Sequence, residues 1–147
     1  MICLKFNIDD FFYGLCYEQI VEIVPCVALT PIAGAPEYVA GYFNYRGRIT
    51  PVIDLTMALN KHASPRVLGS RIVVVNYENN RLLGLLLTNA TETMDVDMSE
   101  DSLQSSGIKS EAAFMGEISI TDGISIQLVN TRGLIPPEVQ EQLYQER

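Results

Sequence analysis

The sequence predicts an all-β protein, built as a barrel, a sandwich or two small barrels, with helices only as minor additions. Short apolar runs with period-two alternation recur along most of the 147 residues, and turn-forming residues separate them. Hydrophobic residues make up 48% of the chain and charged residues 19%, a balance typical of one folded domain and not of a disordered tail. About nine or ten short strands are expected, with a polar break near residues 60–70.

The first third of the chain contains four candidate strands. Apolar side chains at the even positions of residues 2–8 share one face, and an acidic turn leads into a returning strand over 11–17. Short strands are expected at 21–25 and 27–32, at sheet edges or ends because proline interrupts both stretches. Residues 35–39 are expected to form a turn or a short helical patch.

The next segment predicts a hairpin followed by a short helix. Strands over 40–45 and 48–54 flank a single glycine and two arginines. Asp54 is placed to cap a helix over 55–60, and residues 61–70 mix Pro, Gly, Ser and charge, as a loop or linker does. The apolar residues expected in the core here are Val39, Phe43, Ile49 and Val52.

The second half repeats the β pattern. Nearly continuous apolar runs at 71–77 and 81–90 predict strands that are buried on both faces. The acidic, Ser-rich residues 95–110 are expected to form an exposed loop with irregular or partly helical structure. Residues 116–129 alternate around an Asp-Gly turn and predict a hairpin, and residues 136–145 predict a closing helix with proline in its first turn.

Charge and composition exclude several classes of function. The net charge is −8 and the pI is about 4.5, so the chain lacks the basic face that nucleic acid requires and is not suited to an anionic membrane surface. It shows no signal peptide and no apolar run of the length that spans a membrane. Three cysteines, Cys3, Cys16 and Cys26, are expected to be buried reduced thiols, which places the protein in the cytosol.

Catalytic and metal-binding patterns are weak. The single histidine, His62, lies in a loop-like stretch far in sequence from the cysteines, and no C-x-x-C spacing offers a metal site. Glycine-rich phosphate loops are also missing. Neither a catalytic group nor a cofactor is therefore predicted, and the chain is interpreted as a binding protein. A cytosolic β-barrel that binds a small ligand, or that uses Cys16 or Cys26 as a nucleophile, remains the alternative.

The stretch DVDMSED was compared with a calcium-binding loop. Asp95, Asp97 and Ser99 match the first ligand positions of such a loop. The turn glycine is replaced by Glu100, however, and the bidentate acid at the twelfth position is replaced by Ser106. The interpretation is an exposed, solvated loop that binds no metal.

Two arginines, Arg46 and Arg48, lie at the tip of the hairpin in this acidic chain. They are either a solvated turn or a point of contact with a partner, since guanidinium groups make bidentate contacts to carboxylates. Gly41 and Gly47 are expected to serve backbone geometry.

The residues around this tip, VAGYFNYRGRITPVIDL, resemble the signature of the CheW family, the coupling scaffolds of bacterial chemotaxis-type arrays. The family form is close to V-x-G-x-x-N-L-R-G-x-x-x-P-V-I-D-L. The matching residues are Gly41, Asn44, Arg46, Gly47, Pro51, Val52, Ile53, Asp54 and Leu55. The stretches FFYGLCYEQIVEIVP and RIVVVNYENNRLLGLLLTNATE, the late hairpin and the closing helix are also similar to the family, so the resemblance covers nearly the whole chain.

The resemblance implies one CheW-like domain over residues 1–147, made of two intertwined five-stranded SH3-like barrels with a groove between them. It implies no catalysis and no cofactor, but binding of a methyl-accepting-type chemoreceptor's cytoplasmic tip and of the regulatory domain of a CheA-type histidine kinase. That regulatory domain has the same fold. The expected location is the cytoplasm, in association with membrane receptor arrays and without insertion into the bilayer.

The resemblance also implies which residues meet the receptor: Arg46 at the turn, and Ile20, Glu22 and Ile23 on the preceding strand. Tyr45 replaces the usual leucine and Arg48 replaces a residue that is more often apolar or Gln, so both are included as candidates that retune partner choice. Residues 87–90, Leu-Thr-Asn-Ala, replace the family's frequent V-D-x-V. An auxiliary member serving a surface-sensing, pilus or second-messenger pathway is plausible.

Overall fold

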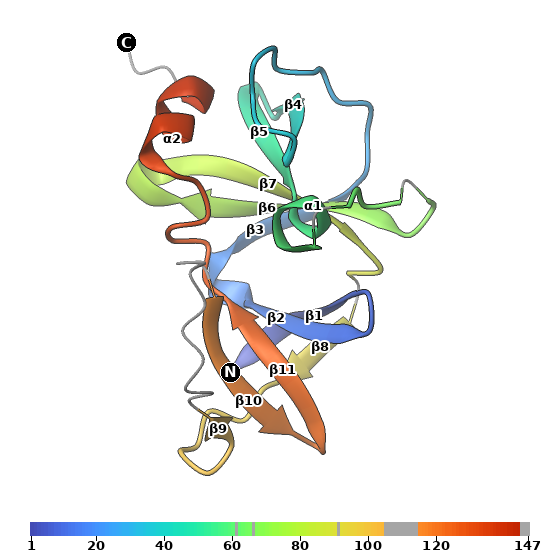
Figure 1. Ribbon diagram of the computed structural model, residues 1–147, viewed down its shortest axis with the longest axis vertical. Helices are drawn as coiled ribbons and strands as arrows, with labels where there is room; N and C mark the ends of the chain where they lie inside the picture. The colour runs from blue at the N-terminus through green and yellow to red at the C-terminus, as the bar shows by residue number, and fades with distance from the viewer. Residues whose placement is uncertain (61, 66, 91, 105–114, 145–147) are drawn as a thin grey trace.

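The computed structural model describes the chain except for residues 61, 66, 91, 105–114 and 145–147 (Figure 1). The fold is all-β, as predicted, and consists of two sheets with a few short helices. The chain builds part of the first sheet, then the whole of the second, and then returns to complete the first. The two sheets are therefore intertwined, in agreement with the expected pair of SH3-like units.

The first sheet has the strand order β8-β1-β2-β11-β10-β9. Its strands are β1 (Ile2–Ile8), β2 (Phe11–Cys16), β8 (Glu92–Asp95), β9 (Leu103–Gln104), β10 (Met115–Thr121) and β11 (Ile124–Val129). Neighbours are antiparallel except β2 and β11, which are parallel. Five strands were expected, and the sixth is the two-residue edge strand β9, which lies inside the predicted acidic loop.

The second sheet has the order β3-β6-β7-β5-β4. Its strands are β3 (Ile20–Pro25), β4 (Val39–Tyr45), β5 (Arg48–Asp54), β6 (Ser70–Tyr77) and β7 (Arg81–Thr88). β6 and β7 are its central hairpin and are almost fully buried, as their continuous apolar runs predicted.

The predicted strand over 27–32 is wrong. This segment makes only an isolated bridge, in which Thr30 and Tyr42 exchange two backbone hydrogen bonds of 2.9 Å. Pro25 ends β3 before this segment and Pro31 lies inside it, and because proline has no N–H to donate, each removes a hydrogen bond that a ladder here would need. Residues 35–39 form a turn that enters β4, as expected.

The helices are short and close the ends of strands. They are α1 (Leu55–Asn60), α2 (Pro137–Leu143) and the single 3₁₀ turns η1 (Tyr17–Gln19) and η2 (Glu78–Asn80). Asp54 precedes α1 and accepts a 3.2 Å hydrogen bond from the N–H of Met57. It also accepts the N–H of Ser64, so the residue that caps the helix also fixes the loop behind it.

One apolar core joins the two sheets. Leu4, Phe6 and Ile8 of β1 belong to the same buried cluster as side chains of β6 and β7. The members from those two strands are Val73, Val75, Tyr77, Leu83, Leu85 and Leu87. Burying one such apolar side chain stabilises a fold by roughly 1.5–3 kcal/mol.

Two predictions of burial are wrong or only partly right. Ile49 is 65% exposed because it lies next to the hairpin tip, beyond the part of β5 that is covered. All three cysteines are thiols without a disulfide, but only Cys3 is fully buried.

Among the described residues, no helix is long and apolar enough to cross a bilayer.

A histidine bridge connects the turn between β1 and β2 to the segment after α1. His62 Nε2 lies 3.1 Å from Asp9 Oδ1, and Nδ1 lies 3.3 Å from the carbonyl oxygen of Ala63. Both partners are acceptors, so both ring nitrogens must carry protons for both bonds to form. The hydrogen bond to Asp9 raises the pKa of His62 above its ordinary value.

We predict that Gly41→Ala destabilises the fold more than Gly47→Ala does. An added Cβ at Gly41 would lie 2.5 Å from the carbonyl oxygen of Thr30, and φ there is +140°. At Gly47 φ is +85°, but no atom lies within 4 Å. Urea denaturation should show a loss of about 1 kcal/mol for Gly47→Ala and of at least about 2 kcal/mol for Gly41→Ala. Equal losses would mean that the close approach to Thr30 does not constrain this position.

We also predict that the His62 imidazole titrates above about pH 6.5 because of Asp9. Since the folded pKa is raised, the pair stabilises the fold at pH values below the unfolded pKa, and this contribution is lost as the pH rises through the folded pKa. NMR can follow this titration without ambiguity because the chain has a single histidine. Asp9→Asn should return the pKa toward its ordinary value, and an unchanged pKa would contradict the bridge.

Candidate functional site

The β4–β5 hairpin tip is a tight two-residue turn. Arg46 and Gly47 occupy its two central positions with φ of +49° and +85°, the left-handed pair that matches the twist of a hairpin. Asn44 holds the turn closed, because its Oδ1 accepts a 2.7 Å hydrogen bond from the N–H of Gly47. In the sequence, Asn44 was noted only as a match to the family signature. An Asn shortly before a glycine is nevertheless a recognisable signal of a side chain that closes a turn.

Three of the predicted site residues meet at this tip, and we call Glu22, Tyr45 and Arg46 the tip cluster. The Tyr45 hydroxyl donates to Glu22 Oε1 at 2.5 Å, and Arg46 Nη2 donates to the same oxygen at 2.7 Å. The Arg46 guanidinium carbon also lies 5.5 Å from the centre of the Tyr45 ring. The hydrogen bond to Glu22 raises the pKa of Tyr45, which keeps the phenol protonated as the donor.

The tip cluster also closes the second sheet. Glu22 is on β3 and Tyr45 on β4, which are the two outermost strands in the order of that sheet. Their hydrogen bond therefore requires the sheet to curl until its edges approach. Sequence spacing alone does not indicate this contact, because the two residues pair only through the curvature of the sheet.

The cluster exposes the Arg46 guanidinium to solvent. The Tyr45 side chain is buried, whereas the Arg46 side chain is 75% exposed and the Glu22 side chain 36%. A guanidinium has five N–H donors in a rigid fork, so the pairing with Glu22 leaves further donors for an outside acceptor. Tyr45 and the turn hold Arg46 in place, and this reduces the entropy that binding would cost.

The other candidates lie apart from the cluster. Ile20 and Ile23 are half-buried and pack against the core that joins the two sheets, on either side of a β-bulge that shifts the register next to Glu22. Arg48 points to the opposite side of the hairpin, where its Nη2 donates a 3.0 Å hydrogen bond to the carbonyl oxygen of Asn80. Asp54 is buried as a helix cap and is not available to a partner.

The described residues do not form a metal site. They contain no group of three or more His, Cys, Asp or Glu side chains placed to hold a metal ion. Both ring nitrogens of His62 are engaged by Asp9 and Ala63 instead of a thiol. The Asp97 carboxylate of the acidic loop accepts hydrogen bonds from the Ser102 hydroxyl and the Ser99 N–H, and these bonds lower the pKa of Asp97. Its oxygens therefore have hydrogen-bond donors within the loop itself.

Comparison with known proteins identifies the family and agrees with the fold. The family model of the CheW-like domain matches residues 3–138. The chemotaxis protein CheW of Rhizobium meliloti is 28% identical over 141 residues, which cover 94% of this chain and 89% of that protein. The CheW protein of Helicobacter pylori is 30% identical over 97 residues, which cover 66% of this chain but only 58% of that protein.

A solved structure agrees in fold as well as in sequence. The crystal structure of the scaffolding protein TtCheW from Thermoanaerobacter tengcongensis superposes with a TM-score of 0.81 at 27% sequence identity. The superposition covers 94% of this chain and 89% of that protein. The resemblance first noted at the hairpin signature thus extends through both sheets.

Proposed function

The chain belongs to the CheW-like family, and from this premise we propose that it is a non-catalytic adaptor that couples chemoreceptors to a CheA-type histidine kinase. A chemotaxis-type scaffold role follows from the family and from its similarity to a scaffolding protein. The observation that carries the finer proposal is the tip cluster, in which Arg46 is held on a rigid turn with its charge exposed.

We assign the receptor contact to Arg46 as the main anchor. A charge-assisted hydrogen bond to a carboxylate is among the stronger polar contacts that a protein makes, and a few such anchors dominate the affinity of a modest signalling interface. Tyr45 and Glu22 position Arg46, while Ile20 and Ile23 shape the adjoining strand through the core. The partner surface that matches this arrangement is acidic, as we propose for the cytoplasmic tip of the receptor.

The kinase contact is proposed to use another part of the molecule. The regulatory domain of a CheA-type kinase is expected to share this fold, so the contact would join the end of one small barrel to the end of a related one. The single domain of two barrel subdomains suits this role, because receptor and kinase can be bound at the same time. We therefore place the protein in the cytoplasm, at membrane receptor arrays.

Arg46→Glu should abolish receptor-dependent control of the kinase while leaving thermal stability nearly unchanged. The variant loses an exposed ion pair, and such pairs contribute only about 0–1 kcal/mol to folding. Autophosphorylation of the kinase, measured with receptor-containing membranes and this protein, reports the coupling. Melting followed by circular dichroism reports the fold.

Two controls separate a partner contact from a local effect. Glu22→Gln removes the same ion pair but keeps Arg46 and an acceptor for Tyr45, so coupling should weaken much less than in Arg46→Glu. Arg132→Glu reverses the charge of an exposed arginine outside the tip cluster and should have no effect. Normal coupling by Arg46→Glu, or an equal loss in Glu22→Gln, would refute the assignment of Arg46 as the receptor anchor.

The adaptor proposal and the thiol-dependent alternative make opposite predictions for the half-exposed cysteines. The alternative predicts that function is lost without them, and the adaptor proposal predicts that it is kept. The double substitution Cys16→Ser, Cys26→Ser should couple receptor to kinase as well as the parent protein does. Cys3 should stay unreactive toward an alkylating reagent until the protein unfolds, because burial raises the pKa of its thiol to about 11. Loss of coupling in a folded double variant would revive a function for the thiols.

A further inference from the structure

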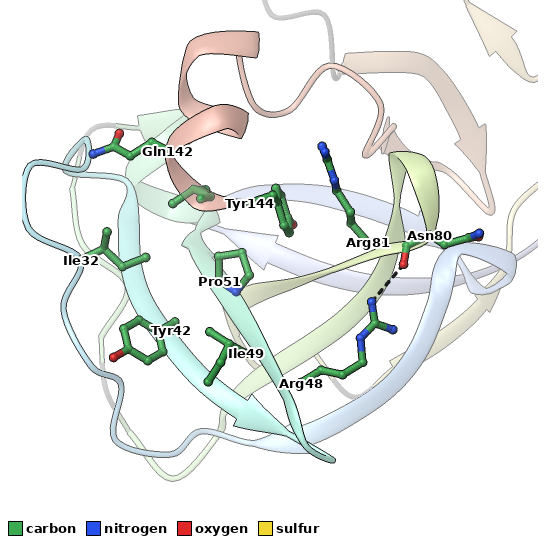
Figure 2. A pocket seen from close by; sticks show the side chains of 10 residues that line it. Ile32, Tyr42, Arg48, Ile49, Pro51, Asn80, Arg81, Gln142 and Tyr144 are labelled. Atoms are coloured by element: carbon green, nitrogen blue, oxygen red, sulfur yellow. Dashed lines mark hydrogen bonds between the residues drawn. The ribbon is translucent and has the colours of Figure 1, made fainter. Parts of the chain in front are cut away.

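A hollow of about 620 Å³ lies between the β4–β5 hairpin, the start of β7 and the end of α2, and none of the tip-cluster residues lines it (Figure 2). This is within the size range of sites that bind small molecules or peptide side chains. We call it the C-terminal hollow. Its lining residues include Arg48, Ile49, Pro51, Arg81, Gln142 and Tyr144.

One wall of the C-terminal hollow is fixed by Tyr144. Its ring lies between the Arg81 guanidinium, at 4.9 Å, and the ring of Tyr77, which is stacked at 6.3 Å. Its hydroxyl donates a 2.8 Å hydrogen bond to the carbonyl oxygen of Leu82. This wall is therefore already in place before any ligand binds.

The charge of the hollow is opposite to that of the protein. Its described lining residues include two arginines, Arg48 and Arg81, and no Asp or Glu, in a chain that has 18 acidic and 10 basic residues. Burial raises the pKa of Tyr144, and the charges of Arg81 and Arg48 both oppose that rise, so both charges act on its hydroxyl. An acidic partner is therefore attracted at this place against the net negative charge of the chain.

The opposite side of the hollow is apolar and continues beyond it. Ile49, 65% exposed, and Tyr42 line both this hollow and a neighbouring one of about 510 Å³. The neighbouring hollow is lined mainly by apolar side chains, including Val27 and Phe43. A surface with cations at one end and apolar side chains along its length is too extended for a small anion alone.

We propose that the C-terminal hollow binds an acidic peptide segment of a partner protein, with its carboxylates at Arg48 and Arg81 and an apolar side chain against Ile49. This contact goes beyond the adaptor function proposed above and does not depend on Arg46. Arg48 and Arg46 would then serve different partners, although they are two residues apart.

A direct binding measurement tests the proposal without receptor or kinase. The probe is the capped, fluorescein-labelled peptide EELEEL, titrated with the full chain and followed by fluorescence anisotropy. Binding should weaken by about tenfold or more in Arg48→Glu and should fall as salt is raised to about 0.5 M. Arg132→Glu, a matched charge reversal at an exposed arginine that lines neither this hollow nor the tip cluster, should bind the probe as the parent protein does.

Three results would overturn the proposal. The first is equal binding of the uncharged counterpart QQLQQL, which would show that the carboxylates are not recognised. The second is equal binding by Arg48→Glu and the parent protein. The third is full displacement of the probe by millimolar inorganic phosphate, which would indicate a site for small anions. Amide NMR shifts on adding EELEEL should cluster at Ile49, Gln142 and Tyr144, and shifts confined to other strands would also contradict it.

Discussion

Packing of the β1 side chains Leu4, Phe6 and Ile8 against the β6–β7 hairpin is the contact on which the rest of the structure depends. It joins two sheets that are formed by alternating parts of the chain, and each sheet adds a smaller buried cluster of its own. Tyr77 adds the C-terminal segment to this core, because its hydroxyl lies at the backbone of Ile135 and near the Gln140 amide. The helix α2, which follows β11 of the first sheet, is thereby packed on the second.

A core of this kind leaves the edges and turns free for recognition. The tip cluster contributes little to stability, since surface ion pairs are weak, but it is held by a sheet that is firmly packed. A left-handed turn, the Asn44 side chain and the buried Tyr45 fix Arg46 before any partner arrives. For an adaptor, such preorganisation matters more than catalytic geometry, because its work is binding.

The sequence predicted those parts of the fold that depend on local pattern. Period-two alternation located β1 and the β10–β11 hairpin, and continuous apolar runs located β6 and β7. It failed where the outcome depends on neighbours in space: residues 27–32 are apolar but pair only at Thr30, and Ile49 continues the alternation of β5 into solvent. The hydrogen bond between Tyr45 and Glu22 could not be predicted from the sequence for the same reason, because it forms only when the sheet curls.

The two arginines of the hairpin illustrate how one short signal can have two physical consequences. In sequence, Arg46 and Arg48 are one basic patch on either side of Gly47. In the structure, the left-handed turn directs one toward Glu22 on β3 and the other toward Asn80 at the β6–β7 connection. A tight turn therefore places neighbouring charges on separate surfaces, where each has its own surroundings. If the protein is the adaptor proposed above, this separation would let the two arginines meet different partners, which charge composition alone does not reveal.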